Sequence, residues 1–221
     1  LPISLKDQFR SKNLISSYGM IANIEVDKCD SYLVKIMLEL GAVPLCKSNV
    51  PQGLLALESN CYIWKQAKNP WNLSKTCGGS SGGEAGLLAA RCSPLGIGTD
   101  IGGSIRNPAN YCGIYGFKPT ISKISSVGVK KANNKDYEGF DKIVSSIGPM
   151  SLYFDDILLF CRSFFGKFPD DLNADKSPFN EKEYSEFSSK KLNIGYSYKN
   201  SRFELCKGIE EKFESTLMLY K

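Results

Sequence analysis

The chain has 221 residues, of which 42% are hydrophobic, 11% aromatic and 23% charged. These proportions are those of a globular protein and exclude a disordered or fibrous chain. The absence of histidine from these residues excludes Ser-His-Asp and Cys-His catalytic arrangements and any histidine-ligated metal site within them. A net charge of +5, with no basic block between aromatic residues, argues against a nucleic-acid partner.

The eight cysteines are scattered without a C-x-x-C pair, which excludes zinc-ribbon and thioredoxin-type sites. Several lie in apolar or glycine-rich surroundings, where a small buried thiol packs well. We therefore expect reduced thiols and an intracellular location rather than a set of disulfides. No apolar stretch approaches the ~20 residues that a membrane-spanning helix needs. Because the first residue is Leu1 and Lys221 lies inside an expected helix, we expect a fragment of a longer protein.

The first part of the chain predicts alternating strand and helix. Residues 2–6 form a short apolar run typical of a buried strand, and residues 42–46 form a second one. Between them, apolar residues at helical spacing over 33–40 predict a helix that Asp30 caps and Gly41 ends. Helix and strand alternating with short loops predict an α/β layer architecture.

Glycine becomes frequent and charge sparse between residues 69 and 120. The glycines alternate with apolar residues that need burial, unlike the residues of a flexible linker. Packed glycines of this kind indicate special backbone angles or a close approach of the backbone. We expect a helix to begin near Gly82, with Ser81 as its cap.

Residues beyond 121 carry weaker patterns. We expect a buried turn at 147–150, a packed helix at 154–164, a surface excursion over 166–191, a strand at 192–196 and a final helix around 209–220.

Two clusters combine glycine with serine, at residues 78–84 (GGSSGGE) and 98–106 (GTDIGGSIR). Neither has the lysine followed by serine or threonine that a Walker A phosphate loop needs, and Gly102 comes one residue too late for a G-x-G-x-x-G motif. Ser104, at the end of a glycine-rich turn, fits acyl transfer instead, because consecutive backbone N–H groups can converge beside its hydroxyl. Such an oxyanion hole contributes about 3–4 kcal/mol of transition-state stabilisation per donor.

A serine nucleophile needs a base, and without histidine the natural candidate is lysine. The pKa of a lysine, about 10.4, must fall by several units through burial before the amine can act as a base at neutral pH. Lys6 follows an apolar run at the end of the first expected strand. From the residues alone, an exposed lysine is the commoner outcome at such a position.

The two glycine-serine clusters, followed by Pro108-Ala109, resemble the amidase signature family. The resemblance implies an α/β fold in which a mixed central β-sheet is sandwiched between α-helices (α/β/α), here incomplete. Residues 1–221 would be the N-terminal part of a single amidase signature domain, with the core motifs in 1–120 and the C-terminal half of the domain missing.

The resemblance also implies a Ser-Ser-Lys triad that uses no metal and no cofactor. The nucleophile falls on Ser104, the bridging cis serine on Ser80 and the base on Lys6. We expect Asp100 and Arg106 to hold the loop of the nucleophile by hydrogen bonds and a salt bridge. The implied oxyanion hole and substrate contacts are the backbone N–H groups of Ile101, Gly102, Gly103 and Ser104, together with Ser80 and Leu54.

Further details resemble the fatty acid amide hydrolases within the family, namely residues 49–52 (NVPQ), 69–71 (NPW), Glu84 and 111–113 (YCG). They imply a small, lipid-like substrate, a fatty acyl amide, cleaved through an acyl-serine intermediate. They also imply association with an endomembrane through regions outside this chain, and they leave a homodimer open.

Other functions remain as alternatives. The A subunit of glutamyl-tRNA(Gln) amidotransferase, a glutamine amidase with partner subunits, has the same fold, but residues 50–52 and Glu84 argue against it. A non-catalytic binding module is a second alternative, and the joint presence of Lys6, Ser80 and Ser104 argues against it. The third is a fragment that neither folds nor catalyses alone.

Overall fold

The computed structural model describes residues 1–130, 144–187, 190, 193, 195–196 and 205–219. They form two compact units, Leu1–Phe179 and Asn180–Lys221. Both glycine-serine clusters lie in the first unit.

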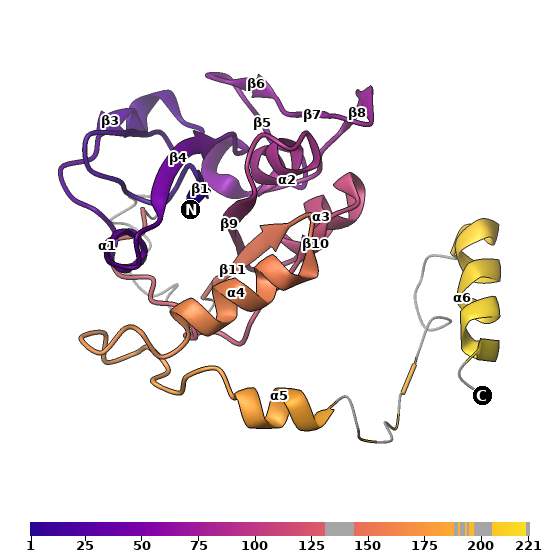
Figure 1. Ribbon diagram of the computed structural model, residues 1–221. Helices are drawn as coiled ribbons and strands as arrows, with labels where there is room; N and C mark the ends of the chain where they lie inside the picture. The colour runs from indigo at the N-terminus through magenta and orange to yellow at the C-terminus, as the bar shows by residue number, and fades with distance from the viewer. Residues whose placement is uncertain (131–143, 188–189, 191–192, 194, 197–204, 220–221) are drawn as a thin grey trace. The chain divides into compact units, whose positions relative to one another are not determined.

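A five-stranded mixed sheet forms the centre of the first unit (Figure 1). Its strands, in spatial order, are β10 (Tyr115–Gly116), β11 (Ser146–Ser151), β9 (Leu95–Asp100), β1 (Pro2–Lys6) and β4 (Val43–Ser48). β1 runs parallel to both of its neighbours, whereas β11 is antiparallel to β9 and to β10. The sheet confirms the mixed α/β class predicted from the sequence.

Helices cover both faces of this sheet. On the first face, α1 (Tyr32–Glu39) and α4 (Phe154–Phe164) pack in one apolar cluster with Ile3 and Leu5 of β1. Because successive side chains of a strand point to opposite faces, Ser4 and Lys6 point to the second face. There Ser4 hydrogen-bonds to Glu84 of α2 (Gly82–Ala89), which packs with α3 (Arg106–Cys112) in a second cluster. The packed helix predicted at 154–164 is confirmed as α4.

The alternation of glycine with apolar residues in β9 follows from this layering. Leu95 and Ile97 join the apolar cluster of the first face. Gly96 faces α2, and a Cβ there would lie only 2.2 Å from Glu84 Oε2. The glycine therefore allows α2 to approach the sheet closely.

Shorter elements join the sheet to the helices within the described part of the first unit. They are β2 (Ile15–Ser16) paired with β3 (Glu25–Val26), β5 (Asn60–Cys61) with β6 (Lys65–Gln66), β7 (Lys68–Asn69) with β8 (Asn72–Thr76), and the 3₁₀ turns η1 (Ile21–Asn23) and η2 (Gln52–Leu54).

The helix predicted over 33–40 is present as α1, but its predicted cap is wrong. Ser31 occupies the N-cap position, and the Asp30 carboxylate accepts the backbone N–H of Lys12 at 2.7 Å instead. The predicted end is confirmed, because Gly41 follows the C-cap residue with a φ of +78°. This left-handed conformation favours glycine.

The turn predicted at 147–150 is wrong, because these residues lie in the middle of β11. The strand pairs with β9 along its whole length, from Ser146 opposite Asp100 to Ser151 opposite Leu95. Glycine and proline favour turns when only neighbouring residues are considered. Pairing with a strand about 50 residues earlier in the sequence decides the conformation here.

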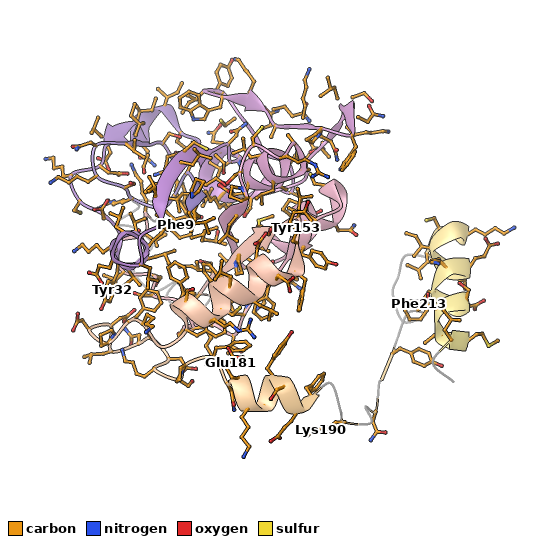
Figure 2. All side chains as sticks on the ribbon, viewed as in Figure 1. Phe9, Tyr32, Tyr153, Glu181, Lys190 and Phe213 are labelled. Carbon is orange, nitrogen blue, oxygen red and sulfur yellow. The ribbon has the colours of Figure 1, made fainter. Side chains whose placement is uncertain are left out.

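The surface excursion predicted over 166–191 is wrong for its first part. Phe168 is fully buried, and the ring of Tyr32 packs edge-on against it with ring centroids 5.5 Å apart. Tyr32 itself, on α1, is labelled in Figure 2. Asp171 is also buried and accepts a 2.6 Å hydrogen bond from Ser125 Oγ. A buried aromatic side chain therefore anchors this otherwise polar segment.

The second unit contains α5 (Glu181–Phe187) and α6 (Lys207–Leu219) among its described residues. Neither helix has a buried residue among those described. For residues 181–187 this agrees with the predicted surface excursion. The final helix predicted around 209–220 is confirmed as α6. The strand predicted at 192–196 lies partly outside the described residues, which omit 192 and 194.

All eight cysteines are free thiols, as predicted. Cys77 and Cys112 are buried in the apolar cluster formed with α2 and α3. Within the part of the chain that the structure describes, none of the helices combines the length and the hydropathy needed to span a bilayer.

Candidate active site

Lys6 ends β1, and its side chain is fully buried. Its Nζ donates to Ser80 Oγ and to Thr99 Oγ1, each at 2.8 Å, and to the Thr99 carbonyl oxygen at 3.4 Å. Burial lowers the pKa of Lys6 from 10.5 to about 7, against the opposing effect of the Asp100 and Glu84 carboxylates. The amine therefore gives up its proton near neutral pH, as a general base requires. The exposed lysine, the commoner outcome from the residues alone, is not what the structure shows.

Ser80 lies in the loop before α2, and the Gly79–Ser80 peptide bond is cis. The side chain of Ser80 is buried, and its carbonyl oxygen accepts a 3.3 Å hydrogen bond from Ser59 Oγ. The next residue, Ser81, donates its backbone N–H to the carbonyl oxygen of Ser104 at 3.1 Å. This bond holds the loop of Ser80, residues 78–81 (called the serine loop below), against the loop that carries Ser104.

Ser81 occupies the N-cap position of α2, but its side chain does not cap the helix. Its Oγ donates to the Thr99 carbonyl oxygen at 3.3 Å, while Ser59 Oγ accepts the backbone N–H of Gly82 at 2.8 Å. The predicted capping role of the Ser81 hydroxyl is therefore wrong. The hydroxyl instead ties the start of α2 to β9.

Asp100 organises the loop that carries Ser104. Its carboxylate accepts the backbone N–H groups of Gly103 at 2.8 Å, Ile105 at 3.1 Å and Arg106 at 3.3 Å. The Arg106 guanidinium adds hydrogen bonds of 3.0 and 2.9 Å from Nε and Nη2. Burial acts to raise the pKa of Asp100, but these hydrogen bonds outweigh it and lower the pKa to about 2. The predicted loop-holding role of this pair is confirmed.

The backbone N–H groups predicted for the oxyanion hole are not equivalent. The N–H of Gly103 is already bonded to Asp100, and the φ of Gly103, +121°, lies in the region that favours glycine. Among the described residues, the N–H groups of Ile101, Gly102 and Ser104 have no acceptor. This conformation therefore offers three of the four predicted donors.

The structure joins the predicted triad in two different ways. Lys6 and Ser80 are in direct hydrogen-bond contact. Among the hydrogen bonds of the described residues, none links the Ser80 hydroxyl to the Ser104 hydroxyl. The contact between the two loops is the backbone hydrogen bond from Ser81 N–H to the Ser104 carbonyl oxygen. The structure therefore brings Lys6 and Ser80 into contact and places the Ser104 backbone against the loop of Ser80.

Leu54 lies in η2 and is half-buried, with a φ of +61°. The residues that follow Leu54 lie close to the cis peptide bond between Gly79 and Ser80. A Cβ at Gly79 would lie only 2.9 Å from the Ala56 carbonyl oxygen. Leu54 therefore belongs to the segment that borders the serine loop.

Sequence reasoning missed the roles of two buried polar side chains beside Lys6. Thr99 Oγ1, which accepts from Lys6, donates to Gln8 Oε1 at 2.8 Å. Glu84 accepts a 2.6 Å hydrogen bond from Ser4 Oγ, and burial raises its pKa from 4.5 to about 7. The signal that could have found them is the presence of polar residues, Ser4 and Thr99, within otherwise apolar strands.

The family profile described as Amidase matches residues 1–219 of the sequence. The chain therefore belongs to the amidase family. This membership agrees with the resemblance on which the site residues were predicted.

Curated relatives extend well beyond this chain. The sequence is 40% identical over 199 residues to Fatty-acid amide hydrolase 1 of Sus scrofa, which covers 89% of this chain and 33% of that protein. It is 35% identical over 222 residues to the Vitamin D3 hydroxylase-associated protein of Gallus gallus, covering 99% of this chain and 47% of that protein. It is 38% identical over 203 residues to an acetamidase of Emericella nidulans, covering 89% of this chain and 36% of that protein. The chain thus spans a third to a half of the length of these relatives.

Solved structures share the fold. Fatty acid amide hydrolase superposes with a TM-score of 0.76 at 32% identity, covering 82% of this chain and 32% of that chain. The A subunit of glutamyl-tRNA(Gln) amidotransferase from Thermotoga maritima superposes with a TM-score of 0.71 at 26% identity, covering 80% of this chain and 38% of that chain. These similarities confirm the predicted amidase signature fold.

Proposed function

We propose that the protein is a serine amidase that hydrolyses carboxylic amide bonds through an acyl-serine intermediate. The observation that carries this proposal is the fully buried Lys6 amine, 2.8 Å from Ser80 Oγ and with its pKa lowered by burial to about 7. A buried amine whose hydrogen bonds go only to hydroxyl and carbonyl oxygens costs stability. Such a group in contact with a serine loop is typical of a functional site.

In the proposed acylation, Ser104 Oγ attacks the carbonyl carbon of the amide and forms a C–O bond while the carbonyl π electrons move to oxygen. The Ser104 proton passes to Ser80 Oγ as the Ser80 proton passes to Lys6 Nζ. The backbone N–H groups of Ile101, Gly102 and Ser104 stabilise the oxyanion. The protons then return along the same relay to the nitrogen atom as the C–N bond breaks. Water hydrolyses the acyl-serine with the same proton movements.

As the substrate we propose a fatty acyl amide. The 40% identity to the Sus scrofa fatty-acid amide hydrolase supports this choice. Apolar side chains also border the serine loop, since Leu55 and Leu57 follow Leu54 with exposed fractions of 91% and 64%. A short acyl amide is the second candidate, because an acetamidase is 38% identical to this chain.

The remaining predictions stay proposals. They are that residues 1–221 form the N-terminal part of a single amidase domain and that the protein is intracellular and meets an endomembrane through other regions, with a homodimer left open. The family match over residues 1–219 supports the first of them.

Labelling with a fluorophosphonate tests the proposed serine chemistry on the full-length protein. We expect the adduct on the peptide that contains Ser104, with no adduct in Ser104→Ala. Labelling should slow by about 10²–10⁴-fold in Lys6→Ala, the usual contribution of a general base.

Ser74→Ala is the serine control, because Ser74 is exposed and its Oγ donates to Asn72 Oδ1, away from the proposed relay. Its labelling rate should remain within a few-fold of the parent. An unlabelled but folded parent protein would overturn the serine mechanism and favour the binding module.

A further inference from the structure

The hydrogen bonds of Lys6 continue to a residue that the proposed relay does not use. Thr99 Oγ1 lies 2.8 Å from Lys6 Nζ and 2.8 Å from Gln8 Oε1. Gln8 is buried, and its backbone carbonyl oxygen accepts the N–H of Lys130 at 2.8 Å. Gln8, Thr99, Lys6 and Ser80 therefore form one continuous chain of buried polar groups.

The amide of Gln8 sets the direction of this chain. A threonine hydroxyl has one hydrogen to donate. That hydrogen goes to Gln8 Oε1, which as an amide carbonyl oxygen can only accept. Toward Lys6, the Thr99 hydroxyl therefore acts as an acceptor.

The acceptors around Lys6 determine where its lone pair points. The ammonium form has three N–H groups, and its three acceptors are Thr99 Oγ1, the Thr99 carbonyl oxygen and Ser80 Oγ. Neither oxygen of Thr99 can return a proton, because one is a carbonyl and the other has its hydrogen committed to Gln8. Only the Ser80 hydroxyl can donate to the neutral amine.

We infer that Gln8 is a positioning residue: by accepting the Thr99 hydroxyl hydrogen, it keeps both N–H groups of the neutral Lys6 amine on Thr99 and directs the lone pair at Ser80 Oγ. This inference rests on the proposed amidase function. Without Gln8, the Thr99 hydroxyl is free to rotate and donate to Lys6 Nζ. The lone pair that must accept the Ser80 proton is then occupied.

The charged groups near Lys6 do not supply this direction. Asp100 and Glu84 act on the amine through their charge, while their hydrogen bonds go to the Ser104 loop with Arg106 and to Ser4. They influence how readily Lys6 holds a proton, whereas Gln8 influences which neighbour that proton comes from.

A double-mutant cycle tests the inference on the full-length protein. Gln8→Met keeps the side-chain volume and removes the amide acceptor, while Thr99→Val removes the hydroxyl through which Gln8 is inferred to act. We expect Gln8→Met to lower kcat by about tenfold, the upper range for one neutral hydrogen bond, with KM unchanged. In the Thr99→Val background the same substitution should change kcat by less than about twofold, because coupled residues are not additive. An equal loss of kcat in both backgrounds would show a structural role only and overturn the inference.

Gln8→Glu is the matched rescue variant, because an ionised carboxylate can only accept from Thr99. We expect it to recover most of kcat at alkaline pH, with the acid limb of the rate profile moved to higher pH by the added negative charge. A Gln8→Glu variant as slow as Gln8→Met at alkaline pH would contradict the inference.

The two proposals fail separately. If Ser104→Ala retains full activity, the proposed function is wrong. If Ser104→Ala is inactive and Gln8→Met is as fast as the parent, only the inference is wrong.

If Gln8→Met does not unfold cooperatively, a comparison of Thr99→Ser with Thr99→Val tests the inference instead. Thr99→Ser keeps the hydroxyl and should retain kcat within about threefold, whereas an equal loss in both variants would overturn the inference.

Discussion

Lys6 shows how strongly one residue depends on its surroundings. The same side chain that would hold its proton to a pKa of about 10.4 in water has a pKa of about 7 at the end of β1, because burial penalises the charged amine. The Asp100 and Glu84 carboxylates limit this shift. Lys6 can therefore serve as the proposed base only because the fold removes it from water.

The pH dependence of the reaction follows from this pKa. Since only the neutral amine can accept the Ser80 proton in the proposed relay, kcat/KM should fall by about tenfold per pH unit below the pKa of Lys6, about 7, and level off above it. The check is the pH–rate profile of the full-length protein on an amide substrate.

Glu84→Gln provides the control for this profile, because the pKa of Glu84 is also raised to about 7. Removing its charge should move the acid limb to lower pH, since the carboxylate raises the pKa of Lys6. If the acid limb of the pH–rate profile disappeared in Glu84→Gln, the titrating group would be Glu84 and not Lys6.

Among the elements, α2 approaches the sheet closely with its own backbone. Its first turn lies against the end of β4, where the Gly83 N–H donates to the Asn49 carbonyl oxygen at 3.1 Å. A Cβ at Gly83 would lie 2.3 Å from the backbone nitrogen of Asn49. The start of the helix, and with it the serine loop, is thus positioned by a contact between two backbones.

Gly83→Ala should therefore destabilise the protein. Backbone atoms cannot turn aside as a side chain can, so we expect the free energy of unfolding to fall by about 1–3 kcal/mol, the usual cost of overpacking. Urea titration followed by circular dichroism measures it.

Gly86→Ala, in the same helix, is the comparison. Its added Cβ would first meet Cys77 Sγ at 3.0 Å, and the gain in helix propensity of about 1 kcal/mol offsets that contact. Equal urea midpoints for the two variants would contradict the proposed backbone contact.

At the scale of the whole molecule, the site depends on segments that are distant in sequence. The hydrogen bond from Lys6 to Ser80 spans 74 residues, and that from Thr99 to Gln8 spans 91. Parallel pairing of β1 with β9 brings these segments together. A segment that bears Leu55 and Leu57 lies beside them, exposed to solvent.

The length of the acyl chain tests the proposed substrate at this scale. Each buried methylene contributes about 0.8 kcal/mol, so kcat/KM should rise by up to about fourfold per added methylene as the primary amide is lengthened from acetamide. A series of amides assayed on the full-length protein gives the slope. A maximum at acetamide would favour the short acyl amide instead.

Local pattern and residue identity sufficed to predict several elements and the family. The apolar runs at 2–6 and 154–164 predicted β1 and α4, because burial of apolar side chains decides both. The two glycine-serine clusters identified the family, and through that resemblance Lys6, Ser80 and Ser104 were predicted as the catalytic residues.

Which polar groups meet, and which way their hydrogen bonds run, follows from the packing of the folded chain and not from local sequence. The strand at 147–150, the full burial of Lys6 and the contact of Thr99 with Gln8 all depend on partners far away in the sequence. A local pattern records the preference of its own residues, whereas burial and hydrogen bonding are set by what packs against them.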